Sequence, residues 1–127
     1  GLQTIGFGHL MLPTDNFKCI TAEKAVELLY QDYAYAETSV GTKYPWADGE
    51  TRLVLINMTY QMGQTGVSKF KKALQCMKDY RYMCATIELL NSRWASQTSL
   101  RASRLAGRIL AISVSQNAKQ GVKREAP

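Results

Sequence analysis

The sequence is poor in the residues that build metal and redox sites. The 127-residue chain has one histidine, His9, and three cysteines, Cys19, Cys76 and Cys84. The cysteines are odd in number, and none of them shows the close paired spacing of a zinc-ligand set. We therefore expect free thiols, buried or partly exposed, and neither a metal ion nor another cofactor.

Long apolar runs and acidic residues are also scarce. No apolar stretch approaches the roughly 18 residues of a membrane-spanning helix, so membrane insertion is not expected. The 16 lysines and arginines outnumber the 10 aspartates and glutamates, which gives a formal net charge of +6. Such an excess favours a polyanionic partner: nucleic acid, anionic lipid or an anionic cell-wall polymer. Charge alone does not choose among these three classes.

Hydrophobic residues make up 46% of the chain, enough for one compact domain with its own core. The chain begins with Gly1 rather than methionine, and it begins inside a motif. We therefore expect a processed product or part of a longer protein.

One stretch, Asp48–Gly66, reads as a buried central helix. Asp48 is a favourable N-cap whose carboxylate can accept from first-turn N–H groups, and Glu50 suits the helix dipole. Its apolar residues cover nearly the whole helix circumference, which is typical of a helix enclosed by others. Gly63 and Gly66 are expected to end it.

The remaining segments are expected to surround this helix. Their predicted order is a hairpin at Gly1–Leu12, a turn at Pro13–Asn16, a helix from Thr21 to Val40, a linker at Gly41–Trp46, helices at Ser68–Met77 and Tyr80–Leu90, a polar loop at Asn91–Ser99, a last helix at Leu100–Val114 and a polar tail from Gln116.

Helical spacing also predicts which faces are buried. The expected inner faces are Ala22, Ala25, Val26, Leu29, Tyr33, Ala36 and Val40 in the first helix, Met83, Cys84, Ile87 and Leu90 in the fourth, and Ala102, Leu105, Ala106, Ile109, Ile112 and Ser113 in the last.

Short motifs give the chain a family likeness. It resembles the bacteriophage T4-type lysozymes, the muramidase family of phage endolysins and of the lysozyme domains of phage tail spikes. The matching stretches, in the family's order and with nearly its spacing, are TIGFGHL at Thr4–Leu10, ITAEKA at Ile20–Ala25, LINMTYQMGQTGV at Leu55–Val67, SRWASQT at Ser92–Thr98 and RASR at Arg101–Arg104.

The resemblance implies an α+β, mainly α, two-lobe fold without its N-terminal helix. Residues 1–40 would form a small β-hairpin lobe with a long connecting helix, residues 41–115 the helical lobe, and residues 116–127 a polar tail or linker. Without the first helix, an apolar groove should be exposed on the helical lobe.

The resemblance also implies hydrolysis of the bond between N-acetylmuramic acid and N-acetylglucosamine in bacterial peptidoglycan. The family's glutamate acid and its aspartate lie upstream of the threonine that matches Thr4, so both catalytic carboxylates are expected before Gly1. Thr4 would position the attacking water, and His9 would support the site or serve only as a structural histidine.

The family's sugar-contacting positions fall on Leu10 and Tyr60, and on Ala73 and Glu88, where the family has polar uncharged groups. Tyr60 and Gln61 are expected to face the substrate cleft, with plain core or helix surface as the alternative. Trp94 is expected to pack in the core, with a platform for sugar as the alternative. Four arginines either make a solvated helix face or attract an anionic wall polymer: Arg93, Arg101, Arg104 and Arg108.

Two functions remain open. The first is a lysozyme acting on the host cell wall in the periplasm, either from the infected-cell cytoplasm or as part of the virion tail. The second is a catalytically inactive glycan-binding or structural domain that contacts other segments of a phage tail protein. Nucleic acid is not an expected partner, although an arginine face would support it by charge.

Overall fold

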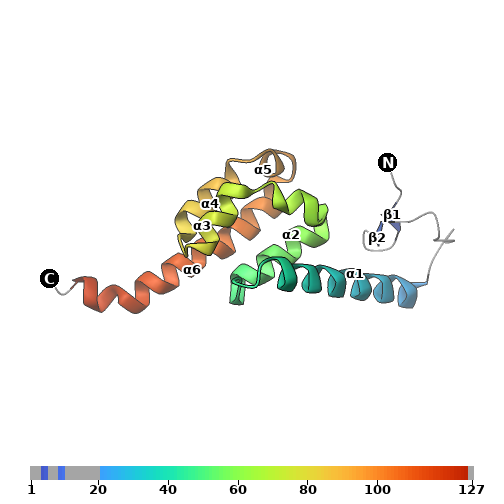
Figure 1. The fold of residues 1–127 in the computed structure, drawn as a ribbon, viewed down its shortest axis with the longest axis horizontal. Coiled ribbons are helices and arrows are strands. Elements are labelled where there is room, and N and C mark those ends of the chain that lie inside the picture. Colours follow the sequence, from blue (N-terminus) through green and yellow to red (C-terminus); the bar gives the residue numbers. More distant parts are fainter. Residues whose placement is uncertain (1–3, 6–8, 11–20, 126–127) are drawn as a thin grey trace.

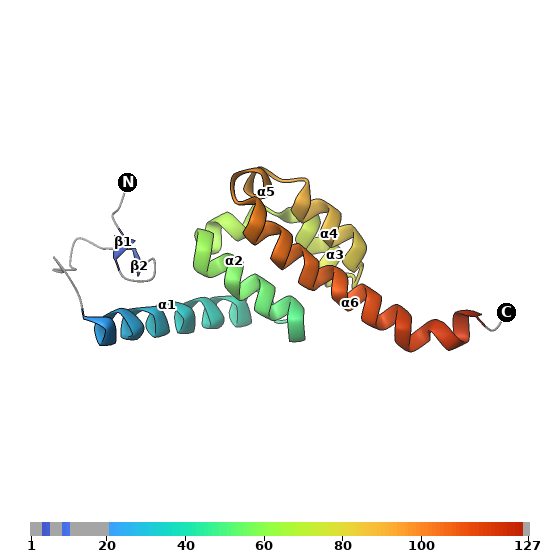
Figure 2. The same ribbon diagram turned by 180° about the vertical axis from the view of Figure 1, so that it is seen from behind.

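The computed structural model describes residues 4–5, 9–10 and 21–125, with side chains for residues 21–116. Its elements are β1 (Thr4–Ile5), β2 (His9–Leu10), α1 (Ala22–Lys43), α2 (Gly49–Ser68), α3 (Lys71–Lys78), α4 (Tyr82–Leu90), α5 (Arg93–Gln97) and α6 (Ser99–Glu125). The structure is mostly helical, as predicted. Helices α2 to α6 form one cluster, from which α1 extends on one side and the end of α6 on the other (Figures 1 and 2).

Helix α1 begins where the sequence predicts. The Thr21 hydroxyl accepts a hydrogen bond of 3.1 Å from the Lys24 amide, which is the expected N-cap contact. The helix runs three residues past the predicted end, to Lys43. The predicted inner face is only partly correct. Buried positions are Ala25, Leu28, Ala36, Ser39 and Val40, whereas Val26 and Tyr33 are exposed. The C-terminal part of α1 lies against the helical cluster (Figure 2).

Helix α2 is the buried central helix. Val54, Leu55, Ile56 and Met58 are at most 1% exposed, although Leu53 lies at the surface. Asp48 occupies the N-cap position, but its carboxylate makes no capping hydrogen bond, contrary to the prediction. The following residue, Gly49, has a left-handed φ of 50°, so the backbone departs from ordinary cap geometry at this point.

A glycine kink divides α2 near its end. Gly63 has φ 80° and ψ 167°, a conformation that favours glycine, and it interrupts the helix as expected. Gly66 does not end the helix, which continues to Ser68. Its role is steric, because a Cβ at this position would lie 2.8 Å from Cγ of Met62.

Helices α3 and α4 form a covalently closed hairpin. Cys76 and Cys84 form a disulfide, with their Cα atoms 5.8 Å apart, so the expectation of free thiols is wrong for these two residues. Cys19 lies outside the described residues. Tyr80, in the connecting turn, has a left-handed φ of 59°. The turn thereby brings two cysteines that are eight positions apart in sequence into bonding distance.

The predicted inner face of α4 is correct only at Cys84, which is partly buried against the core. Met83, Ile87 and Leu90 are about half exposed, and the buried residues are Tyr82, Ala85, Thr86 and Leu89. Because apolar residues occupy nearly every position of this helix, spacing alone does not select a face. The buried side faces α6, since the Thr86 hydroxyl lies 3.5 Å from the Ala106 carbonyl.

The last two helices complete the core. The predicted loop at Asn91–Ser99 contains α5, whose N-cap Ser92 accepts a hydrogen bond of 3.1 Å from the Ala95 amide. The predicted inner face of α6 is confirmed at Ala102, Leu105, Ala106 and Ile109, all of them buried. The helix does not end at Val114 but continues through the predicted tail to Glu125, as no proline interrupts it before Pro127.

Candidate functional site

A groove of about 810 Å³ lies between α2 and the first half of α6. Its lining combines polar, apolar and basic side chains: Asn57, Tyr60, Gln61, Thr98, Ser99, Leu100, Arg101, Arg104, Leu105 and Arg108. The sequence predicts an apolar groove on this lobe, and the observed one is apolar in part but carries three arginines. Tyr60 and Gln61, the two central-helix residues predicted to face a cleft, both line it.

The pKa of Tyr60, on α2, depends on burial and on charged residues of two other helices. Burial raises the pKa of its hydroxyl above the ordinary value of 10.0. The negative charge of Asp32, on α1, raises this pKa further, whereas Arg101, on α6, lowers it. The phenol is therefore neutral at physiological pH and can donate a hydrogen bond or contact an apolar sugar face.

Gln61 is fixed by a side chain from another helix. Its Oε1 accepts a hydrogen bond of 3.2 Å from Nε1 of Trp94. Trp94 is only 9% exposed, so the prediction that it packs in the core is confirmed. Phe70 meets the Trp94 ring edge-on, with the ring centroids 5.7 Å apart. This aromatic support holds the Gln61 amide at the wall of the groove.

The hairpin residues occupy a separate part of the structure. Thr4 of β1 lies opposite Leu10 of β2, and Ile5 lies opposite His9, in an antiparallel pair. Strand β2 contacts α1. The side chains of Thr4, His9 and Leu10 lie outside the described residues, so their predicted catalytic and sugar-binding roles remain predictions.

Ala73 and Glu88, the other two positions expected to contact sugar, line a second groove of about 330 Å³. It lies between the start of α3 and the α4–α5 junction, and its other lining residues are Lys69, Phe70, Lys71, Lys72, Asn91 and Ser92. These three lysines are not among the predicted site residues. The signal for them is their density, since three lysines fall within four consecutive positions.

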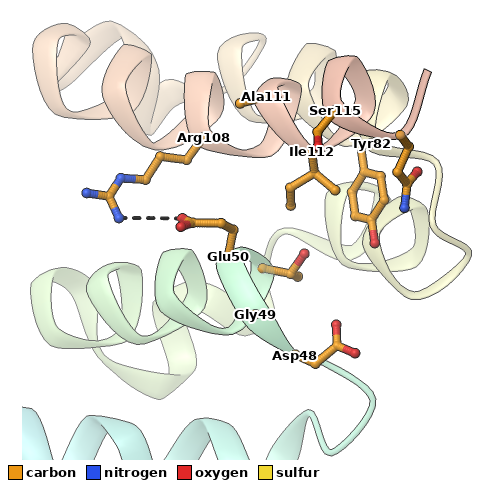
Figure 3. A pocket seen from close by; sticks show the side chains of 10 residues that line it. Asp48, Gly49, Glu50, Tyr82, Arg108, Ala111, Ile112 and Ser115 are labelled. Atoms are coloured by element: carbon orange, nitrogen blue, oxygen red, sulfur yellow. Dashed lines mark ion pairs between the residues drawn. The ribbon is translucent and has the colours of Figure 1, made fainter. Parts of the chain in front are cut away.

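A third cavity, of about 570 Å³, opens where the start of α2 faces α6 (Figure 3). Asp48, Glu50 and Tyr82 line it, and Glu50 forms an ion pair of 3.6 Å with Arg108. Burial raises the pKa of Tyr82, Asp48 raises it further, a hydrogen bond with Thr51 lowers it, and Tyr80 adds a small increase. Sequence reasoning missed this cavity because it joins segments more than fifty positions apart.

The predicted outer face of α6 is observed. Arg101, Arg104 and Arg108 are exposed, and Arg93 is exposed on α5. Arg108 has an acidic partner in Glu50, but both side chains are about half exposed, so their ion pair contributes little stability.

Within residues 21–116, no three histidine, cysteine or acidic side chains are grouped to hold a metal ion. None of the helices that the structure describes has the length and hydropathy of a membrane span.

Curated proteins with similar sequences include two named as probable T4-type lysozymes and a phage spike protein. "Probable T4-type lysozyme 2" of Dictyostelium discoideum is 35% identical over 92 residues, covering 68% of this chain and 54% of that protein. "Probable T4-type lysozyme 1" of the same organism is 27% identical over 133 residues, covering 83% and 78%. The "Pre-baseplate central spike protein Gp5" of Enterobacteria phage T4 is 30% identical over 137 residues, covering 87% and 24%.

The chain thus spans about half the length of the first of these relatives and about a quarter of the spike protein. The profile of the family described as Phage lysozyme matches residues 1–109, which is most of the chain. The family likeness carried by the motifs at Thr4–Leu10 and Leu55–Val67 is therefore confirmed: the chain belongs to the phage lysozyme family.

Proposed function

We propose that the chain is part of a lysozyme that hydrolyses the bond between N-acetylmuramic acid and N-acetylglucosamine in bacterial peptidoglycan. The observation that carries the proposal is the groove between α2 and α6. It is lined by Tyr60 and Gln61, which the family resemblance associates with the substrate cleft. An aromatic ring suits the apolar C–H face of a sugar. A fixed amide suits hydrogen bonding with the sugar hydroxyls.

In this proposal the β1–β2 pair forms a small lobe, α1 connects it to the helical lobe, and the glycan strand lies between the two lobes. Thr4 holds the attacking water, and His9 supports that end of the site. Leu10, Tyr60 and Gln61 contact sugar. The antiparallel register, which pairs the backbone of Thr4 with that of Leu10, supports a common location for these two residues.

The catalytic carboxylates are placed in sequence that precedes Gly1. Glycoside hydrolysis needs one carboxylic acid to protonate the leaving oxygen and a second carboxylate to activate water, here with inversion at the anomeric carbon. The described lining of the α2–α6 groove contains neither aspartate nor glutamate. Asp48 and Glu50 line a different cavity, and Glu50 is engaged by Arg108. The chain from Gly1 to Pro127 is therefore expected to be inactive by itself.

The positive charge of the α2–α6 groove supports contact with a preceding segment that carries carboxylates. Arg101 and Arg104 line it beside Leu100, which is 67% exposed. A preceding helix with acidic and apolar residues would match both properties, because opposite charges and apolar area are complementary across such a contact. That helix would carry the general acid to the edge of the groove.

Release of reducing sugar from purified peptidoglycan tests the proposal. The chain from Gly1 should release none, and the same chain extended upstream to include the preceding helix should release it. Replacing Tyr60 by alanine in the extended chain should lower the rate and the binding of peptidoglycan. Tyr35→Ala, on the exposed surface of α1, is the matched control. Full activity of the chain from Gly1 would contradict the placement of the acid upstream.

A catalytically inactive tail domain is the second candidate. It is favoured by the similarity to the central spike protein Gp5, which covers 87% of this chain. Such a domain would bind glycan, or join other segments of a phage tail protein, without cleaving. Peptidoglycan binding by the extended chain with no release of reducing sugar would select this candidate. In the enzymatic case, we place the action in the host periplasm, reached from the infected-cell cytoplasm or from the virion tail.

A further inference from the structure

The 330 Å³ groove, lined by Lys69, Lys71, Lys72 and Glu88 among others, is a concentration of positive charge on the helical lobe. The lysines are exposed, and Glu88 is half-buried. Among the described side chains, no ion pair joins any of these lysines to a carboxylate. Three cations against one anion leave the groove with a positive field that attracts an anionic group.

The floor and rim of this groove offer hydrogen-bonding groups as well as charge. Asn91 and Ser92 line it at the α4–α5 junction. The Ser92 hydroxyl already donates to the Leu89 carbonyl at 2.6 Å and accepts from the Ala95 amide. The exposed amide of Asn91 can therefore serve a ligand, while Ser92 fixes the shape of the junction.

A chain of side-chain contacts through the core links the lysine groove to the larger groove. Phe70 lines the lysine groove and meets Trp94 edge-on. Trp94 in turn donates to Gln61, which lines the α2–α6 groove. The wall of the α2–α6 groove is thus connected to the lysine groove through Trp94 and Phe70.

We propose that the lysine groove binds oxyanion groups carried on the cell-wall polymer, either carboxylates of peptide substituents or phosphates of an attached polyanion. This inference rests on the proposed function and extends it from the sugar to its charged substituents. Lysine ammonium groups bind both oxyanions as point charges with three donors each. Glu88 opposes binding, because its charge repels the same ligand.

Binding of the full chain to purified wall fragments at low salt tests the proposal. Lys69→Gln/Lys71→Gln/Lys72→Gln should weaken binding on the order of 10-fold, since charge-assisted hydrogen bonds are lost. The triple variant Lys24→Gln/Lys43→Gln/Lys78→Gln removes the same charge elsewhere and should change binding by less than about 2-fold. Equal losses in the two variants would overturn the site, because they would report net charge alone.

Glu88→Gln gives a second measurement of opposite sign. It should strengthen binding of wall fragments by about 2- to 3-fold, because it removes the repelling charge from the groove. A purely structural role for Glu88 would give no gain. Unchanged or weakened binding, with the fold intact by circular dichroism, contradicts the proposal.

The source of the oxyanion is resolved with two stripped substrates. If the difference between the two triple variants disappears after amidase removes the peptides, the ligand is a peptide carboxylate. If it disappears after acid extraction of phosphate polymers, the ligand is a phosphate. A difference that persists on glycan lacking both groups overturns the proposal. Failure of the unaltered chain to bind any wall fragment would overturn the proposed function as well, whereas equal binding by both triple variants overturns the lysine groove alone.

Discussion

The indole N–H of Trp94 donates a hydrogen bond of 3.2 Å to the side-chain oxygen of Gln61, across 33 positions of sequence. This contact joins α5 to the central helix at the wall of the α2–α6 groove. A tryptophan that is 9% exposed thereby satisfies its polar atom and fixes the orientation of a candidate sugar-binding amide. Core packing and site geometry depend on the same pair.

Replacing Gln61 by methionine should destabilise the fold by about 1 kcal/mol, because the partly buried Trp94 donor loses its acceptor while side-chain length is kept. Urea denaturation followed by tryptophan fluorescence measures the change. Gln64→Met, at an exposed position just past the Gly63 kink, is the control and should stay within about 0.5 kcal/mol. Equal stability of the two variants would show that the hydrogen bond contributes nothing.

Sequence patterns predicted the helices best where polar and apolar residues separate cleanly. On α6, Arg101, Arg104 and Arg108 mark one side and Ala102 and Ile109 the other, so the buried face could be read directly. On α4 nearly every residue is apolar, and the choice of face depends on close approach to α6. That information comes from packing and is absent from the helix's own sequence.

The candidate site could be predicted only in its local part. Tyr60 and Gln61 lie in one contiguous motif, and the structure places both on one groove. The lysine groove needs α3 and the α4–α5 junction to meet, and the Cys76–Cys84 disulfide needs the turn at Tyr80. Such contacts depend on how elements are folded back on one another, which the spacing of the cysteines alone does not specify.

Two buried threonines should respond oppositely to valine substitution. Thr59 and Thr86 are each 6% exposed on helices. Among the described residues, the Thr59 hydroxyl has no hydrogen-bond partner, whereas that of Thr86 donates to the Tyr82 carbonyl at 2.8 Å. Thr59→Val should stabilise the fold by about 1 kcal/mol, and Thr86→Val should destabilise it by a similar amount. Thermal unfolding of both variants measures the contrast, and the same sign of change in both would refute it.

The disulfide between Cys76 and Cys84 should support the α3–α4 hairpin. Closing a loop of eight positions restricts the unfolded chain and is expected to contribute about 2–3 kcal/mol. Reductant should therefore lower the melting temperature of the unaltered chain. The double variant Cys76→Ala/Cys84→Ala should melt at the reduced value and no longer respond to reductant. An unaltered chain that melts at the same temperature with and without reductant would contradict this expectation.

Alkaline pH should destabilise the fold partly through Tyr82. Burial first, and then Asp48, raise the pKa of its phenol above 10.0, so the folded state holds the proton more tightly than the unfolded state. Stability is therefore full below about pH 10 and falls as the pH rises from there through the raised pKa. Tyr82→Phe removes the part of the alkaline loss of stability that comes from ionisation of this phenol. Some slope should remain, because burial also raises the pKa of Tyr44 and Tyr60.

Asp48→Asn provides the complementary test of this pH dependence. Loss of the nearby carboxylate lowers the pKa of Tyr82, which narrows the interval over which the folded state retains the extra proton. Urea denaturation between about pH 8 and about pH 11 should show a shallower decline than in the unaltered chain, but a steeper one than in Tyr82→Phe. If Tyr82→Phe declines as steeply as the unaltered chain, the alkaline loss of stability arises elsewhere. An intermediate slope for Asp48→Asn assigns part of it to the Asp48–Tyr82 pair at the start of α2.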